Sequence, residues 1–403
     1  MVSLMAFPLI DYALRFGALH RIGVVWDKLV LALLIVIAIV RYLAGHRPPR
    51  WIWHKFAWWY MAYCVALVFA GLDKGVLAFA ELKMDIYYIF YALVVPFAIE
   101  EEDVPLLMHT ALTVGILAGV DGLFQYLTKA PIPSNWVDVH EHVRTRVYSI
   151  LQSPNEFGSY MAMTVPVAVG MGMYERNRWR KMLYLGGAAV CLLALLFTFT
   201  RGAFVALVVA ALLAAFLFER RIFIPMAGLL ILVAFLPAVQ HRFADLFSPV
   251  YWIKAAQGGR ILRWKMAFDK MTLDPLFGVG LGRFGGAVAT RQLGTLYADN
   301  YYVKVLAESG LVGLILFLSL QLALLRQVLQ SVRKSLGSRV RFALLGIATG
   351  LLVVLIHNLF ENVFEFAPMI FTYFLYANLA LVWPTEAGST DHKFRTTTGL
   401  SGG

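Results

Sequence analysis

Long uninterrupted apolar runs, separated by short polar stretches, form the main pattern along this chain of 403 residues. Each run has about the 20 residues that an α-helix needs to cross the hydrocarbon core of a bilayer. We therefore expect membrane-spanning helices near residues 24–43, 56–72, 83–99, 104–127, 157–174, 182–200, 203–218, 222–239, 309–330, 340–360 and 367–384. A weaker segment at 4–19, interrupted by Pro8, Asp11 and Arg15, would bring the number to about 12 transmembrane helices.

Composition agrees with a membrane protein. The mean hydropathy is +0.72 and 15% of the residues are charged, whereas roughly a quarter are charged in a soluble domain. Transmembrane β-barrels show alternating segments of about ten residues in place of continuous apolar runs. The expected fold class is an all-α polytopic membrane protein. Cys64 and Cys191 lie inside apolar runs and suggest no disulfide.

Basic residues predict the orientation, because short cytoplasmic loops are enriched in Lys and Arg. If the spans alternate, the basic clusters within 41–55, 176–181, 220–221 and 333–341 all fall on one side, which is then the cytoplasmic side of a bacterial inner membrane. Because most of the net charge of +11 serves this purpose, it does not indicate binding to nucleic acid. The first 20 residues lack a basic start followed by a clean apolar core, so we expect no cleavable signal peptide.

The alternation divides the chain into N-terminal transmembrane helices (1–239), a large outer loop carrying short helices (240–302), C-terminal transmembrane helices (303–385) and a disordered cytoplasmic tail (386–403). It also places three shorter segments on the outer side, namely 128–156, 200–202 and 358–366. We expect these segments and the loop to converge on one face.

The outer loop has an excess of positive charge that short outer loops normally avoid. Against four Asp it carries Arg242, Lys254, Arg260, Arg263, Lys265, Lys270, Arg283 and Arg291. Guanidinium groups bind phosphate in a bidentate manner, so this excess suggests an anion held at the membrane surface.

Two arginine positions fit such a site. Arg260 and Arg263 would share one face of a helix, and Arg201 lies in a turn between two apolar runs. Each has a plainer interpretation: Arg201 extends to lipid headgroups, and 260–264 is an interfacial helix anchored by Trp264.

The stretch 278–285 contains a formal GxGxxG motif, but no strand precedes it and the loop faces away from cytoplasmic nucleotide. Its glycines would let backbone N–H groups approach an oxyanion beside Arg283, although a plain turn is the simpler interpretation.

Several ionisable groups could move a proton. Asp299 lies near the end of the outer loop, beside the polar but non-ionisable Asn300, and Glu308 follows the loop. His357, Glu361 and Glu365 have a four-residue spacing and would share a face if their helix continues past the span. The alternatives are a structural ion pair for the carboxylates and an interfacial position for the histidine. Ser153 to Glu156 fits a capping box that starts a helix. His140 and His142 are too few ligands for a metal site, and we expect neither metal nor cofactor.

These elements together resemble the O-antigen ligase and O-antigen polymerase superfamily over about residues 150–385. The resemblance rests on Gln152-Ser-Pro-Asn-Glu156, Thr200-Arg-Gly-Ala203, Arg260 with Trp264, Asp274-Pro-Leu-Phe-Gly-Val-Gly280, and Asn300 followed by Gly310-Leu-Val-Gly313. It implies a metal-independent inverting glycosyltransferase whose donor is a glycan on undecaprenyl diphosphate at the periplasmic face. Arg201 and Arg260 would bind the diphosphate, assisted by Arg263 and Arg283. Asp299 or His357 would take the proton of the acceptor hydroxyl, with Asn300, Glu308, Glu361 and Glu365 as supporting residues near the acceptor.

One departure affects the subtype. The ligases that use lipid A-core as acceptor have a histidine where this chain has Asp299, which favours a polymerase of O-antigen or exopolysaccharide over a ligase acting on lipid A-core or a protein. We expect the neighbouring arginines to lower the pKa of Asp299. Membrane lipid is an expected partner, and a chain-length regulator is left open. An alternative of another class is a flippase for polyprenyl-linked sugars, but the spans are apolar inside apart from Asp85 and Asp121.

Overall fold

The computed structural model describes residues 2–16, 20–47, 50–70, 75–132, 145–218 and 259–383, with isolated positions between 219 and 258. The expected span 222–239, the tail 386–403, and Arg242, Lys254, His140 and His142 lie outside these residues. In the described part the chain is helical, with one isolated bridge between Gly285 and Tyr297, so the all-α prediction is confirmed there.

The helices follow the apolar runs closely. The long ones are α4 (Trp26–Leu43), α5 (Ile52–Ala70), α6 (Gly75–Val94), α7 (Val104–Leu127), α8 (Pro154–Tyr174), α9 (Arg178–Thr198), α10 (Arg201–Phe218), α16 (Tyr301–Lys334), α17 (Val340–His357) and α18 (Ala367–Val382). The shorter ones are α1 (Val2–Met5), α2 (Phe7–Phe16), α3 (His20–Gly23), α14 (Arg260–Met271), α15 (Ala287–Leu293) and the 3₁₀ turns η2 (Val95–Phe97), η3 (Glu101–Asp103), η5 (Ser149–Leu151) and η7 (Val363–Glu365).

Five described helical segments are long and apolar enough to cross a membrane: Glu101–Leu127, Arg178–Thr198, Arg201–Phe218, Tyr301–Lys334 and Val340–His357. The expected number of about 12 is therefore not confirmed. Charged residues interrupt others, such as α4 with Asp27, Lys28 and Arg41. The weak segment at 4–19 is replaced by α1 and the ten-residue α2, too short to span.

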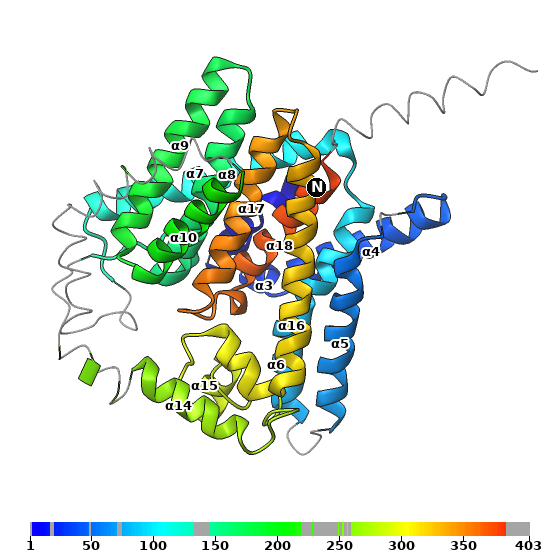
Figure 1. Cartoon of the computed structure of the whole chain (residues 1–403), viewed down its shortest axis with the longest axis vertical. Coiled ribbons are helices and arrows are strands. Elements are labelled where there is room, and N and C mark those ends of the chain that lie inside the picture. The colour runs from blue at the N-terminus through cyan, green and yellow to red at the C-terminus, as the bar shows by residue number, and fades with distance from the viewer. Residues whose placement is uncertain are drawn as a thin grey trace, which may run out of the picture.

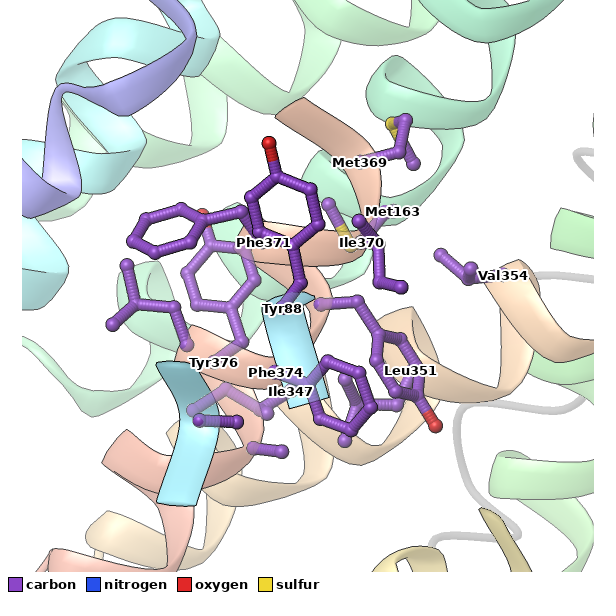
Figure 2. Close-up of a cluster of buried hydrophobic side chains, with 14 of the residues drawn as sticks. Tyr88, Met163, Ile347, Leu351, Val354, Met369, Ile370, Phe371, Phe374 and Tyr376 are labelled. Atoms are coloured by element: carbon purple, nitrogen blue, oxygen red, sulfur yellow. The ribbon is translucent and has the colours of Figure 1, made fainter. Parts of the chain in front are cut away.

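Glycines set the closest helix contact of the core, between α8 and α17. A side chain on Gly170, Gly346 or Gly350 would collide with a backbone carbonyl of the facing helix. Small residues let helices approach backbone to backbone, which is how packing is achieved where lipid removes the hydrophobic drive. Around this contact, side chains of α6, α8, α17 and α18 fill the centre of the molecule (Figure 2), including Tyr88, Met163, Ile347, Leu351, Phe371, Phe374 and Tyr376.

The elements of the outer loop lie together beyond the helical bundle. In Figure 1, α14 and α15 lie at the lower end of the molecule, where α14 packs against α16 and α15 against α6. The glycine-rich stretch 278–286 lies between α14 and α15 in the chain and contacts α16.

A kink in α16 joins this loop to the bundle. Gly310 has φ of 66° and interrupts the helix, freeing the carbonyls of Ala307 and Glu308. The N–H groups of Val279 and Gly280 donate to these two carbonyls at 2.9 Å each. In return, the N–H groups beyond the kink donate to the carbonyls of Pro275 and Leu276. Because a side chain at Gly310 would strike the backbone of Leu276, only glycine fits here.

Candidate active site

The turn 358–362, between α17 and η7, is the point where the segments expected on one side of the membrane meet. The first residues of four described helices, α8, α10, α14 and α16, contact this turn or its neighbours. Helix N-termini present unpaired N–H groups and a partial positive charge, so their convergence favours an anion.

Helix α14 supplies two arginines to this point. Arg260 Nη2 donates to the carbonyl of Phe360 at 2.9 Å. Arg263 Nη1 donates to Asp299 Oδ2 at 2.6 Å, and Arg260 Nε lies 3.9 Å from the same oxygen. Trp264, one turn after Arg260, donates to the carbonyl of Ala298 at 3.1 Å and so fastens α14 to the segment before α16. The two guanidinium groups therefore share one helix face.

Asp299 is held in an unusual conformation by the start of α16. Its φ is 51°, in the left-handed region that Asp tolerates better than most residues. The next residue, Asn300, caps α16 by accepting from the N–H of Val303 and donates its own N–H to Asn362 Oδ1 at 3.1 Å. The turn at 358–362 thereby fixes where Asp299 points.

Helices α8 and α10 bring a second set of groups. Ser153 caps α8, as the sequence predicted, by accepting from the N–H of Glu156. Asn155, in the first turn of α8, donates to Glu361 Oε2 at 2.5 Å. Its own side-chain oxygen accepts from Arg146 at 2.9 Å, and Thr200 donates to the carbonyl of Pro154 at 3.1 Å. Residues 152–156 and 200–203 are thus neighbours in space.

Arg201 is the first residue of α10 and is half-buried. The adjacent Gly202 packs against the end of α17, where a Cβ would lie 3.0 Å from His357 Nε2 and 2.9 Å from Phe360 Cβ. The N-terminus of α10 therefore rests on the same turn whose Phe360 carbonyl binds Arg260.

Two carboxylates at this point have raised pKa values. Burial raises the pKa of Glu361 to about 7, and the charge of Asp299 adds to the shift, while Arg260 and the bond from Asn155 oppose it. Burial also raises the pKa of Asp299 above its ordinary value, although Arg263 and Arg260 act in the opposite direction. The arginines do lower the pKa of Asp299, but the expectation of a net lowered pKa is wrong, because loss of solvent outweighs both ion pairs.

Some predicted site residues lie elsewhere. The helix stripe of His357, Glu361 and Glu365 does not form, because α17 ends at His357 and the chain turns before η7. Glu361 nevertheless reaches the site, since the turn directs it toward Asn155. His357 is buried, and its Nδ1 has no hydrogen-bond partner within the described residues.

Glu308 and Glu365 belong to a separate buried cluster around Lys304, whose side chain is 1% exposed. The ammonium contacts Glu81, lies 3.1 Å from Asp85, and lies 3.5 Å from both Glu308 and Glu365. Three of these carboxylates are close enough together to hold a metal ion, but Lys304 already supplies the cation. We call these five side chains the Lys304 cluster.

The glycine-rich stretch lies against the Lys304 cluster. Several of its N–H groups are bonded within the protein. Gly278 donates to the carbonyl of Asp274, Gly280 to the carbonyl of Glu308, and Phe284 to the carboxylate of Glu308 at 3.1 Å. A side chain at Gly286 would strike Glu365 and Lys304. Arg283 lies beside Gly280 within this stretch, and its assistance to a bound diphosphate stays a prediction.

Sequence reasoning did not assign the roles of Arg146, Asn155 and Lys304. The first two act by holding other side chains, which no spacing indicates. Lys304 had one visible signal, because Glu308 follows it by four residues inside an otherwise apolar helix.

A comparison with protein families agrees with the motifs. Residues 186–318 match the family model described as O-Antigen ligase. The matched part runs from α9 to the first half of α16 and includes Arg201, Arg260 and Asp299. No curated protein matches the chain. The match supports the resemblance of this chain to the O-antigen ligase and O-antigen polymerase superfamily that the motifs indicated.

Proposed function

We propose that this protein is a metal-independent, inverting glycosyltransferase of the bacterial inner membrane that works at the periplasmic face. The donor is a glycan on undecaprenyl diphosphate, and the product is a longer glycan, as made by polymerases of O-antigen or exopolysaccharide. The observation that carries the proposal is the convergence of Arg260, Arg263 and the first turn of α10, bearing Arg201, on one turn lined by carboxylates.

The reaction needs positive charge where the leaving group departs. Inverting transfer leaves two negative charges on a diphosphate, and preorganised cations stabilise that charge best where little water competes. In the proposed arrangement Arg201 and Arg260 bind the diphosphate, and helix N-termini add partial positive charge. Arg263 holds Asp299, and Arg283 assists from the glycine-rich stretch.

The acceptor is placed next to the carboxylates. Asn300 and the turn 358–362 fix the geometry of this side of the site. Asp299 stands where ligases of the superfamily have a histidine, which is why we favour a glycan acceptor over lipid A-core.

The test uses the purified protein with glycan on undecaprenyl diphosphate, with and without lipid A-core. A ladder of longer lipid-linked glycans supports the polymerase, and transfer only with lipid A-core supports the ligase. Arg201→Ala and Arg260→Ala should each abolish the product, whereas Arg178→Ala, an exposed arginine at the start of α9, should not. Normal product from both site variants would refute the proposal.

The alternative of a flippase for polyprenyl-linked sugars has weaker support. A substrate path needs polar groups open to water along the membrane, but five charged side chains inside the described bundle are tied into the closed Lys304 cluster. Transbilayer movement of the donor in vesicles, without any longer glycan, would favour the flippase.

A further inference from the structure

The proposed reaction requires a group that removes a proton from the acceptor hydroxyl. The carboxylates and the imidazole at the turn 358–362 differ in how they are bound. The hydrogen bonds and burial of each group indicate which of them can accept the proton.

Asp299 is committed to the arginines. Its Oδ2 receives Arg263 at 2.6 Å and lies 3.9 Å from Arg260 Nε. A carboxylate in this position keeps two cations on one face and ready for a diphosphate. If it took a proton during the reaction, these contacts would weaken at the moment when the leaving group needs them.

His357 is committed to packing. It is 1% exposed, and its ring edge lies against Gly202 at the start of α10. Nothing in the described part of the chain binds its Nδ1, so no second group orients the ring as a base.

The carboxylate of Glu361 is oriented by hydrogen bonds to both of its oxygens, as a general base requires. One oxygen accepts from Asn155 at 2.5 Å and the other from the N–H of Asn362 at 3.2 Å. Asn155 is in turn held by Arg146, which also donates to the carbonyl of Thr198 at 2.9 Å. This chain of contacts fixes the carboxylate while leaving lone pairs on both oxygens.

The charged surroundings of Glu361 come from several elements. Arg260 on α14 and Asp299 before α16 are its nearest strong electrostatic neighbours. Glu361 also interacts electrostatically with Glu156 on α8 and with Tyr297 before α16. Glu365 in η7 is bound within the Lys304 cluster, with its Oε1 3.5 Å from the ammonium.

We propose that Glu361 is the catalytic base of the glycosyl transfer, and that Asn155 and Arg146 are its positioning residues. The inference rests on the proposed function. The acceptor oxygen forms a bond to the anomeric carbon of the donor, and the bond from that carbon to the diphosphate oxygen breaks. The bonding pair leaves with the polyprenyl diphosphate, and the hydroxyl proton passes to the Glu361 carboxylate, from which water later removes it.

The protonation behaviour of Glu361 fits this role. Its pKa of about 7 lies near the pH at which such a protein works, which is where a general base is most effective. Activity should therefore rise with pH through about 7 as the carboxylate loses its proton.

The first experiment measures glycan elongation against pH for the wild type, Glu361→Gln and Asp299→Asn. Glu361→Gln should lower kcat by about 10²-fold or more and change the donor KM little. It should also lose the acidic limb of the pH profile, which is the rise of activity with pH through about 7. Asp299→Asn should change the donor KM and keep the limb, moved to lower pH because the charge of Asp299 raises the pKa of Glu361. Glu102→Gln, an exposed carboxylate near α7, is the matched control and should behave as the wild type.

A second variant covers the case in which Glu361→Gln fails to fold. Asn155→Ala removes a hydrogen bond that lowers the pKa of Glu361, so the acidic limb should move to higher pH. A purely structural role would lower activity equally at every pH.

The inference is overturned if Glu361→Gln elongates glycans within fivefold of the wild type, if its acidic limb persists, or if Asn155→Ala leaves the limb in place. Loss of the limb in Asp299→Asn would assign the base to Asp299 instead. These outcomes are separate from failure of the proposed function, which is judged by whether Arg201→Ala and Arg260→Ala still elongate the donor.

Discussion

Replacing Lys304 by Met should destabilise this protein strongly, because it removes the only cation of the Lys304 cluster among the described residues. The ammonium lies within 3.5 Å of Asp85, Glu308 and Glu365 and also contacts Glu81. Breaking a buried ion pair by removing one partner costs about 3–5 kcal/mol, since the remaining charge stays out of water without compensation. Met has nearly the same length as Lys, so little of this loss comes from an empty cavity.

The measurement is the apparent Tm in detergent, followed by loss of the monodisperse peak in size-exclusion chromatography after heating. Lys83→Met is the matched control, because Lys83 lies on α6 between Glu81 and Asp85 but is exposed. Adding Glu81→Gln to Lys304→Met should recover part of the loss, since one buried negative charge is removed. The electrostatic reasoning fails if Lys304→Met melts at the same temperature as Lys83→Met, or if the second substitution lowers the Tm further.

Three other predictions concern the site and the kink. Arg260→Lys should impair elongation nearly as much as Arg260→Ala, because Lys lacks the planar fork, and a gel ladder equal to that of the wild type would contradict this. Gly310→Ala should cost about 3 kcal/mol or more, from its φ of 66° and the collision with the loop, whereas Gly186→Ala, with open space around it, should be neutral or stabilising in a thermal melt. Glu361→Gln should raise the free energy of unfolding at pH 8 by up to about 3 kcal/mol relative to the wild type. At pH 4 the two proteins should be equally stable. The folded wild type binds this proton more tightly than the unfolded chain does, and the resulting stability is lost as pH rises through about 7; equal melting curves at pH 8 would argue against that shift.

Much of the fold follows from the sequence alone. The apolar runs predicted α4, α5, α7, α9, α10 and α17 to within a few residues, because helix formation in a membrane depends mainly on local hydropathy. The start of α6 lies eight residues before the predicted one, because charged residues such as Glu81 interrupt the apolar pattern. In the folded protein, Lys304 compensates the charges of Glu81 and Asp85, so the helix continues through them.

The site was predictable in part. The convergence of outer segments followed from alternation, and the shared face of Arg260 and Arg263 followed from helical spacing. The bonds from Asn155 to Glu361 and from Arg260 to Phe360 join residues 206 and 100 positions apart, and no local pattern carries that information. The pKa of Asp299 was misjudged because sequence shows neighbouring charges but not the loss of solvent.

The turn 358–362 lies outside the part of the chain that the family model matches. Arg201, Arg260 and Asp299 fall within residues 186–318, but the carboxylate of Glu361 and its Asn155 support do not. A chimera that exchanges only the matched segment between relatives would inherit the cations from one parent and this carboxylate from the other. Such hybrids should have crossover points before Arg146 and after Glu365, so that all side chains of the candidate site come from the same parent protein.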